Sequence, residues 1–163
     1  MKRHPHLQPL SREHHRALLC WRDLDKELDD SDTARIVSAT KGLLDYANDR
    51  FLSHMADEET LFVGLLNDEL QTRLISEHET LRSLLESARR KLSPALLDIS
   101  ELTQLAAMWR AHIRWEERHM FPYLEANTSD DELQAIGDQL VQKSQTSSCT
   151  IAPSSIADLE NQS

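Results

Sequence analysis

Apolar residues recur every three or four positions along most of this chain, a spacing that places them on one face of an α-helix. The first such stretch opens at Ser11, a residue type that caps helix N-termini, and continues to Leu28. Three more stretches cover about residues 33–66, 69–91 and 98–127. The pattern therefore predicts four amphipathic helices.

Short polar breaks separate these stretches at 29–32, 67–68 and 93–94. Because short connections make neighbouring helices antiparallel, we expect an all-α, up-down-up-down four-helix bundle. A weaker amphipathic stretch over 130–143 predicts a short extra helix that covers one end of the bundle. The domain should span residues 7–143, and the polar, Ser/Thr-rich residues 144–163 should form a disordered tail.

Composition supports the helical reading. The chain has only 3 Gly and 5 Pro among 163 residues, whereas sheet proteins need turn residues at short intervals. Hydrophobic residues make up 39% and charged residues 28%, which is typical of one globular domain with a sizeable core.

Charge and apolar content exclude several classes of function. A net charge of -10 argues against nucleic-acid binding, which depends on clustered Lys and Arg. No apolar run approaches the roughly 20 residues that span a bilayer, and the N-terminus leads into no apolar signal segment. Cys20 and Cys149 lie in no CxxC motif and are expected to be reduced thiols. We therefore expect a cytoplasmic protein without a membrane partner.

The chain contains 8 His, and two of them open a repeated motif. HMADEETLF begins at His54 and HIRWEERHMF begins at His112, so both carry H-x-x-x-E-E and close on an apolar residue followed by Phe. Residues four apart project from the same face of a helix. Each copy therefore presents an imidazole and a carboxylate together, His54 with Glu58 and His112 with Glu116.

A Glu-His dipeptide lies on each of the other two helices, at His14 and His78. Counted from the shared turns, His54, His78 and His112 lie at depths that agree to within about one helical turn. An antiparallel bundle can thus place four imidazoles and two carboxylates at one level of its interior.

The first hairpin fits this layer less well. His14 lies 16 residues before Asp30, whereas His54 lies 22 residues after Asp32. Either the second helix overhangs the first by about 9 Å, or residues 33–38 form a loop or a bent piece.

Two adjacent histidines compete for the position on the first helix. His14 shares the apolar stripe that continues through Trp21, which favours it as the inward residue. His15 lines up with Leu19 and then with Arg22 and is the alternative.

Imidazole suits Fe and Zn, and carboxylates can bridge two metals. Four buried His and two buried Glu without a metal would each cost several kcal/mol in lost solvation unless paired. About two His per metal with two shared Glu would leave coordination positions open for a small ligand.

The segments LSREHHRAL, FLSHMADEETLF, ISEHETL and HIRWEERHMFPYLE resemble the hemerythrin-like HHE cation-binding domain over about residues 7–127. The resemblance implies a four-helix bundle around a non-haem di-iron centre. It implies two iron ions (Fe2+/Fe3+, oxo- or hydroxo-bridged), with Zn or Mn as other occupants. The ligands that it implies are His14, His54, His78 and His112, with Glu58 and Glu116 bridging the irons.

Two departures bear on the role. Oxygen-carrying hemerythrins have a further histidine in an HxxxH pair on the third helix, where this chain has Leu74. They also use an aspartate at i+5 after the last histidine, where this chain has Glu116 at i+4. The resemblance therefore favours a binding protein for O2 or NO that acts in iron handling or in sensing. A di-iron oxidase or peroxidase-like enzyme is the alternative.

The remaining candidates receive structural roles. Glu59 and Glu117 are expected to face solvent or to orient ligands. Glu116-x-x-His119 matches the ExxH signature of ferritin-like proteins, but those need two copies, so His119 is expected to be exposed. His4 and His6 are assigned to a mobile terminus. Three tryptophans are expected in the core: Trp21, Trp109 and Trp115.

Overall fold

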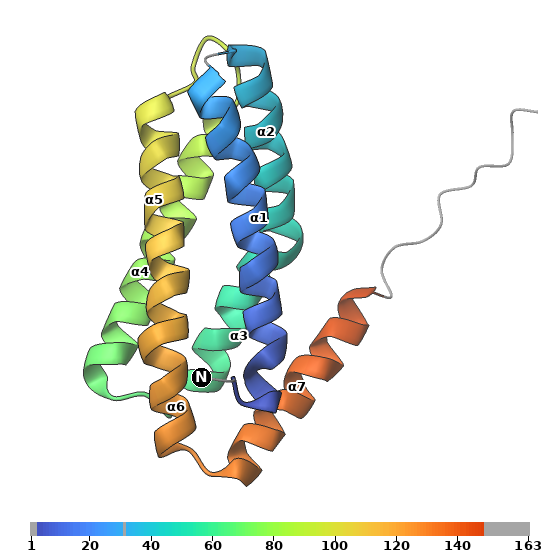
Figure 1. Ribbon diagram of the computed structural model, residues 1–163, viewed down its shortest axis with the longest axis vertical. Helices are drawn as coiled ribbons and strands as arrows, with labels where there is room; N and C mark the ends of the chain where they lie inside the picture. The colour runs from blue at the N-terminus through green and yellow to red at the C-terminus, as the bar shows by residue number, and fades with distance from the viewer. Residues whose placement is uncertain (1–2, 31, 149–163) are drawn as a thin grey trace, which may run out of the picture.

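The computed structural model describes residues 3–30 and 32–148, and within these ranges it contains helices and no strand. Four long antiparallel rods form the bundle, and a further helix leaves its lower end (Figure 1). The predicted all-α bundle is thus confirmed. Within the described ranges, no helix combines the length and apolarity that a membrane crossing requires.

The first rod is α1 (Gln8–Asp30), preceded by a short 3-10 turn, η1 (Pro5–Leu7). The second rod consists of α2 (Thr33–Tyr46), a π-helical turn η2 (Ala47–Phe51) and α3 (Leu52–Phe62). The third rod is α4 (Asp68–Arg90). The fourth consists of α5 (Ile99–Trp115), a second π-helical turn η3 (Glu116–Met120) and α6 (Phe121–Asn127). The extra helix is α7 (Asp130–Ser148).

The polar breaks between rods act as helix caps. The side chains of Asp32, Asn67 and Asp98 each accept a hydrogen bond from a backbone N–H in the first turn of the helix that follows. The predicted cap at Ser11 is wrong, because α1 already begins at Gln8, after the turn that Pro5 opens.

Replacing the cap of α4, Asn67→Ala, should lower the free energy of unfolding by about 1 kcal/mol. The reason is that the Leu70 N–H, now 2.9 Å from the Asn67 Oδ1, would lose its partner. Urea unfolding measures the change. Asn67→Ser keeps an accepting oxygen and should restore most of the loss; equal destabilisation by both variants would show that the cap is not the cause.

Residues 33–38 are helical, within α2, so the loop or bent piece considered for them is wrong. The irregularity of the second rod lies further along, at η2, which ends three residues before His54. A π-turn accommodates an extra residue in its wider i→i+5 loop, and such turns are frequent at functional sites. The π-turn therefore takes up part of the difference in length between the first two rods, next to the level at which the inward histidines lie.

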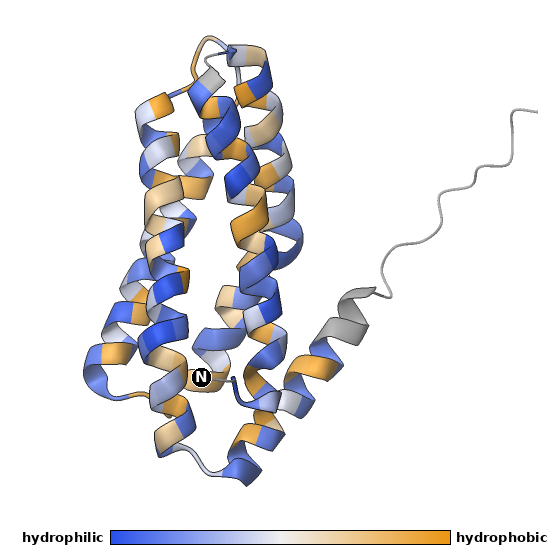
Figure 2. Ribbon diagram, viewed as in Figure 1, coloured by the Kyte–Doolittle hydropathy of each residue, from blue (hydrophilic) through white to orange (hydrophobic). Residues whose placement is uncertain are grey.

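Hydrophobic and hydrophilic segments alternate along every rod (Figure 2), and the inward faces form two separate core clusters. The first core cluster lies toward the α1–α2 connection and includes Ala17, Trp21, Leu81, Leu85 and Trp109. The second core cluster lies toward the α3–α4 connection and includes Leu10, Phe62, Leu74, Trp115 and Phe121. All three tryptophans are buried, as predicted.

The histidine layer lies between these clusters. On α1, His14 follows Leu10 of the second core cluster and precedes Ala17 of the first. On α4, His78 lies in the same way between Leu74 and Leu81. Apolar packing above and below thus determines the level at which the polar residues meet.

The extra helix α7 packs its apolar stripe onto the second core cluster through Leu133, Ile136 and Leu140, as expected for a helix that covers one end. It continues to Ser148, past the predicted end at 143. The rest of the expected tail, with Cys149, lies outside the described residues.

The N-terminal segment packs against the same end, so the assignment of His4 and His6 to a mobile terminus is wrong. Leu7 is fully buried in the second core cluster, and the backbone N–H of His4 donates to Glu125. A Cβ at Gly137 would lie 2.7 Å from the Nδ1 of His6, so a glycine is needed where η1 approaches α7.

Cys20 is a free, half-buried thiol next to the first core cluster, and burial raises its pKa. A raised pKa keeps the thiol protonated and poorly reactive.

Candidate metal centre

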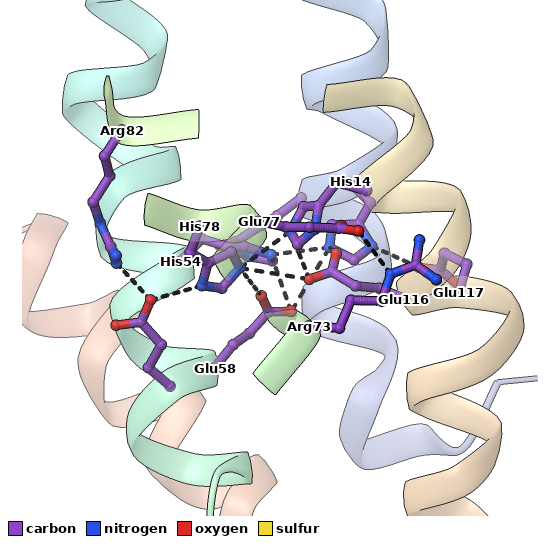
Figure 3. A network of polar contacts seen from close by, with 12 residues as sticks. His14, His54, Glu58, Arg73, Glu77, His78, Arg82, Glu116 and Glu117 are labelled. Carbon is purple, nitrogen blue, oxygen red and sulfur yellow. Dashed lines mark hydrogen bonds and ion pairs between the residues drawn. The ribbon is translucent and has the colours of Figure 1, made fainter. Parts of the chain in front are cut away.

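Six polar side chains from all four rods meet between the two core clusters, and each is at most 2% exposed. They are His14, His54, Glu58, His78, His112 and Glu116. These are the six residues that the sequence analysis selected. Figure 3 shows most of them converging on one point of the bundle interior. His15 is exposed on α1, so the structure brings His14 and not His15 into the cluster.

The six residues form two overlapping groups of potential metal ligands. One group is His14, His54, Glu58 and Glu116, and the other is Glu58, His78, His112 and Glu116. Within each group the donor atoms lie within 4.8 Å of one another. Both carboxylates belong to both groups, which is the arrangement that two metal ions with shared carboxylates would require.

The imidazoles are arranged in two pairs. The Nε2 atoms of His14 and His54 are 2.9 Å apart, and those of His78 and His112 are 3.1 Å apart. Two imidazole nitrogens bound at right angles to one metal, each at about 2.1 Å, would be about 3 Å apart. Each pair therefore has the spacing of two ligands on a single ion.

Each imidazole is also held from outside by a carboxylate at its other nitrogen. The Nδ1 contacts are His14 to Glu117 at 2.8 Å, His54 to Glu13 at 2.7 Å, His78 to Glu59 at 2.7 Å and His112 to Glu77 at 2.8 Å. We call Glu13, Glu59, Glu77 and Glu117 the outer carboxylates. Each joins two neighbouring rods, and together they close a ring around the bundle.

The outer carboxylates determine where the imidazole protons lie. An ionised carboxylate only accepts hydrogen bonds, so each Nδ1 donates, and in the neutral ring each Nε2 lone pair faces the centre. The alternative that Glu59 and Glu117 orient ligands is therefore the one that the geometry favours. Glu13 and Glu77 were not predicted from the sequence to hold ligands, although each directly precedes a layer histidine and this repeated Glu-His dipeptide is the signal that could have identified them.

Two buried carboxylates bring negative charge to the centre of the cluster. All four carboxylate oxygens of Glu58 and Glu116 are buried without a hydrogen-bond partner among the described residues. Imidazole Nε2 atoms nevertheless approach them, with His112 2.8 Å and His14 3.1 Å from oxygens of Glu116. Converging lone pairs of nitrogen and oxygen are stable only around cations, so the residues fit a metal pair.

In the metal-free protein, the close contacts between buried imidazoles and carboxylates also shift the pKa values of these groups. Burial alone would lower the pKa of His112, but the negative charge of Glu116, whose carboxylate oxygen lies 2.8 Å away, raises it to about 10. Burial would raise the pKa of Glu116, but His112 holds it well below its usual range. Without metal, protons on the histidines therefore supply the missing positive charge, and metal binding should release them.

These shifts predict how the stability of the metal-free protein depends on pH. A histidine whose pKa rises on folding stabilises the fold fully below its unfolded value and loses that contribution as pH rises through the folded value. The free energy of unfolding should therefore fall from about pH 6.5, the ordinary pKa, to about pH 10, the pKa of folded His112. Urea unfolding across this range tests the trend.

At acid pH, the free energy of unfolding should change with pH in the opposite direction. The pKa of Glu117 falls to about 2 because its contact with His14 outweighs the effect of burial. Its contribution is present above about pH 4.5 and is lost as pH falls toward 2. Metal-free protein whose stability did not change above pH 7 or below pH 4.5 would contradict both trends.

The second π-turn explains a difference between the two sequence repeats. Glu59 is followed by one residue before the Leu61–Phe62 pair, whereas two residues separate Glu117 from the corresponding Met120–Phe121 pair. The turn η3 spans this stretch and absorbs the extra residue. Both phenylalanines consequently reach the second core cluster, with ring centroids 6.3 Å apart.

Two further residues that the sequence pattern pointed to, Leu74 and His119, lie outside the cluster. Leu74 is fully buried in the second core cluster, where it adds no metal donor. His119 is exposed, as predicted, so the isolated ExxH match belongs to the surface.

Comparison with known proteins agrees with this geometry. The profile of the family described as "Hemerythrin HHE cation binding domain" matches residues 69–143, which include His78, His112 and Glu116. Neither a curated protein nor a solved structure matches the chain. The matched part supplies one imidazole pair and one shared carboxylate. The first two rods supply a second imidazole pair, His14 and His54, and the second shared carboxylate, Glu58. Residues 69–143 of this chain are thus similar to the hemerythrin HHE cation-binding domain family.

Proposed function

We propose that this protein binds a pair of iron ions and presents them to a small ligand such as O2 or NO, in iron handling or in sensing. The proposed ligands are His14 and His54 on one ion, His78 and His112 on the other, and Glu58 and Glu116 between them. The observation that carries the proposal is that two groups of four buried donors share both of their carboxylates. A site for one metal ion would need only one such group of four donors.

The bound iron pair would supply a change of oxidation state and open positions for a small ligand. The protein contributes the rest. The outer carboxylates hold all four imidazoles in one tautomer, and the two core clusters exclude bulk water above and below the layer. Leu74 in place of a fifth histidine favours sensing or iron handling over reversible oxygen transport.

Metal analysis combined with visible spectroscopy tests this proposal. Purified protein, anaerobic and then aerated, should contain about two iron ions per chain and show ferric absorption that changes with azide or NO. Protein that stays free of metal and spectrally unchanged after addition of Fe(II) would overturn the proposal. An oxidase or peroxidase would use the same ligands, and turnover of a substrate would distinguish it.

A matched pair of variants tests the choice between the adjacent histidines. His14→Ala should lose about one metal ion per chain, because it removes a buried donor. His15→Ala should keep both, since His15 is exposed. Metal content after loading and desalting is the measurement, and loss of metal only in His15→Ala would contradict the assignment.

A further inference from the structure

The four outer carboxylates differ in whether an arginine side chain holds them. Arginines pair with three of the four: Arg3 with Glu117 at 2.8 Å, Arg82 with Glu59 at 2.8 Å, and Arg73 with Glu77 at 2.7 Å. Figure 3 labels Arg73 and Glu77. No Lys or Arg among residues 3–30 and 32–148 forms such a pair with Glu13. The carboxylate behind His54 therefore differs from the other three.

This difference divides the two imidazole pairs. His78 and His112 are both backed by carboxylates that an arginine holds, and Arg73 also lies 4.6 Å from the centroid of the Trp115 ring. Their outer carboxylates are 25% and 20% exposed, whereas Glu13, behind His54, is 35% exposed. One metal position thus has two fixed supports, and the other has one.

A cavity of about 330 Å3 adjoins the less supported position. It lies between α1, the second rod and α7, and its wall includes Glu13 and His54. Arg50 and Asp57 line it as well, and Lys143 of α7 forms an ion pair with Asp57 at its wall. Two further cavities, one beside His15 and one beside Leu92, include neither His78 nor His112 in their walls.

We infer that the two metal positions are unequal: the His78–His112 position binds its ion first and holds it, and the His14–His54 position exchanges its ion through the cavity beside Glu13. This inference rests on the proposed function. Its physical basis is that a carboxylate that cannot turn away keeps its imidazole aimed at the metal, and outer partners of this kind are worth about 10–100-fold in metal affinity. Arg73 and Arg82 are positioning residues in this scheme.

Anaerobic titration of the metal-free protein with Fe(II), followed by challenge with a chelator, tests the order. We expect two binding steps that differ by at least about tenfold in affinity, and loss of metal in a fast and a slow phase of equal amplitude. His112→Ala should remove the tight step and the slow phase. His54→Ala should remove the weak step and the fast phase.

The arginines provide the sharper test, because they touch no metal. Arg82→Ala should weaken the tight step by about tenfold and speed the slow phase, whereas Arg82→Lys, which keeps the charge, should restore most of the difference. Arg89→Ala is the matched control on the same helix, since Arg89 pairs with Glu86 away from the layer. It should leave both phases unchanged.

The outcomes separate this inference from the proposed function. Two ions bound with one affinity and released in one phase would overturn the inference and leave the di-iron proposal standing. Loss of the tight step in His54→Ala instead of His112→Ala would overturn it as well. A chain that bound no metal at all would overturn both.

Discussion

Replacing Glu116 by glutamine is expected to abolish binding at both metal positions, with a loss of more than about 100-fold in affinity at each, above the cost of disturbing an outer partner. Glu116 belongs to both groups of donors, and an oxygen of its carboxylate lies 2.8 Å from His112 and another lies 3.1 Å from His14. A neutral amide offers one accepting oxygen and no charge. Metal content after loading, with circular dichroism to verify the helical fold, measures the effect.

The adjacent residue provides the control. Glu117→Gln changes only an outer partner of His14 and should cost about 10–100-fold at the His14–His54 position alone. The contrast between neighbours would show that sharing of the carboxylate, and not general disturbance of η3, causes the double loss. A Glu116→Gln protein that kept one ion at unchanged affinity would contradict the shared role.

Trp109→Ala is expected to lower the free energy of unfolding by about 3–5 kcal/mol. The Trp109 side chain is fully buried in the first core cluster, with its ring centroid 3.7 Å from that of Phe51 and 5.0 Å from that of Trp21. Its removal leaves a large cavity between α5 and the first two rods. Urea unfolding of the metal-free protein measures the loss.

The effect should also reach the metal layer. Phe51 stacks on the ring of His54 at 5.4 Å, so a Phe51 that shifts toward the vacated space would misalign that ligand. Trp109→Phe should recover most of the stability, because the indole Nε1 has no hydrogen-bond partner among the described residues and its loss costs little. Leu19→Ala, at an exposed position, should change stability by less than about 0.5 kcal/mol. Equal effects of Trp109→Ala and Leu19→Ala would contradict the packing argument.

The sequence by itself determined the helical class, the four rods and five of the six inward donors. The reason is that an α-helix has a fixed period, so residues four apart must share a face wherever the helix lies. His54 with Glu58, and His112 with Glu116, could thus be recognised as pairs without any tertiary information. Short polar connections then made antiparallel packing the expected arrangement.

Helix period alone left the choice between His14 and His15 open, because neighbouring residues differ by about 100° around the axis and the rotation of a rod is set by its neighbours. The outer carboxylates also needed the tertiary structure. Glu13 contacts His54 and Glu117 contacts His14 across different rods, at a level fixed by apolar packing on both sides.

Most of the unequal support of the outer carboxylates was decided by tertiary structure, because only Arg73 and Glu77 form an i,i+4 pair within one helix. Arg3 reaches Glu117 because η1 and α7 bury the N-terminal segment, while Arg82 reaches Glu59 across the interface between two rods. Such contacts join residues that are far apart in the chain, and no periodic pattern encodes them. Local repetition therefore determined which residues could bind metal, and packing between the rods decided which side chains contact each of them.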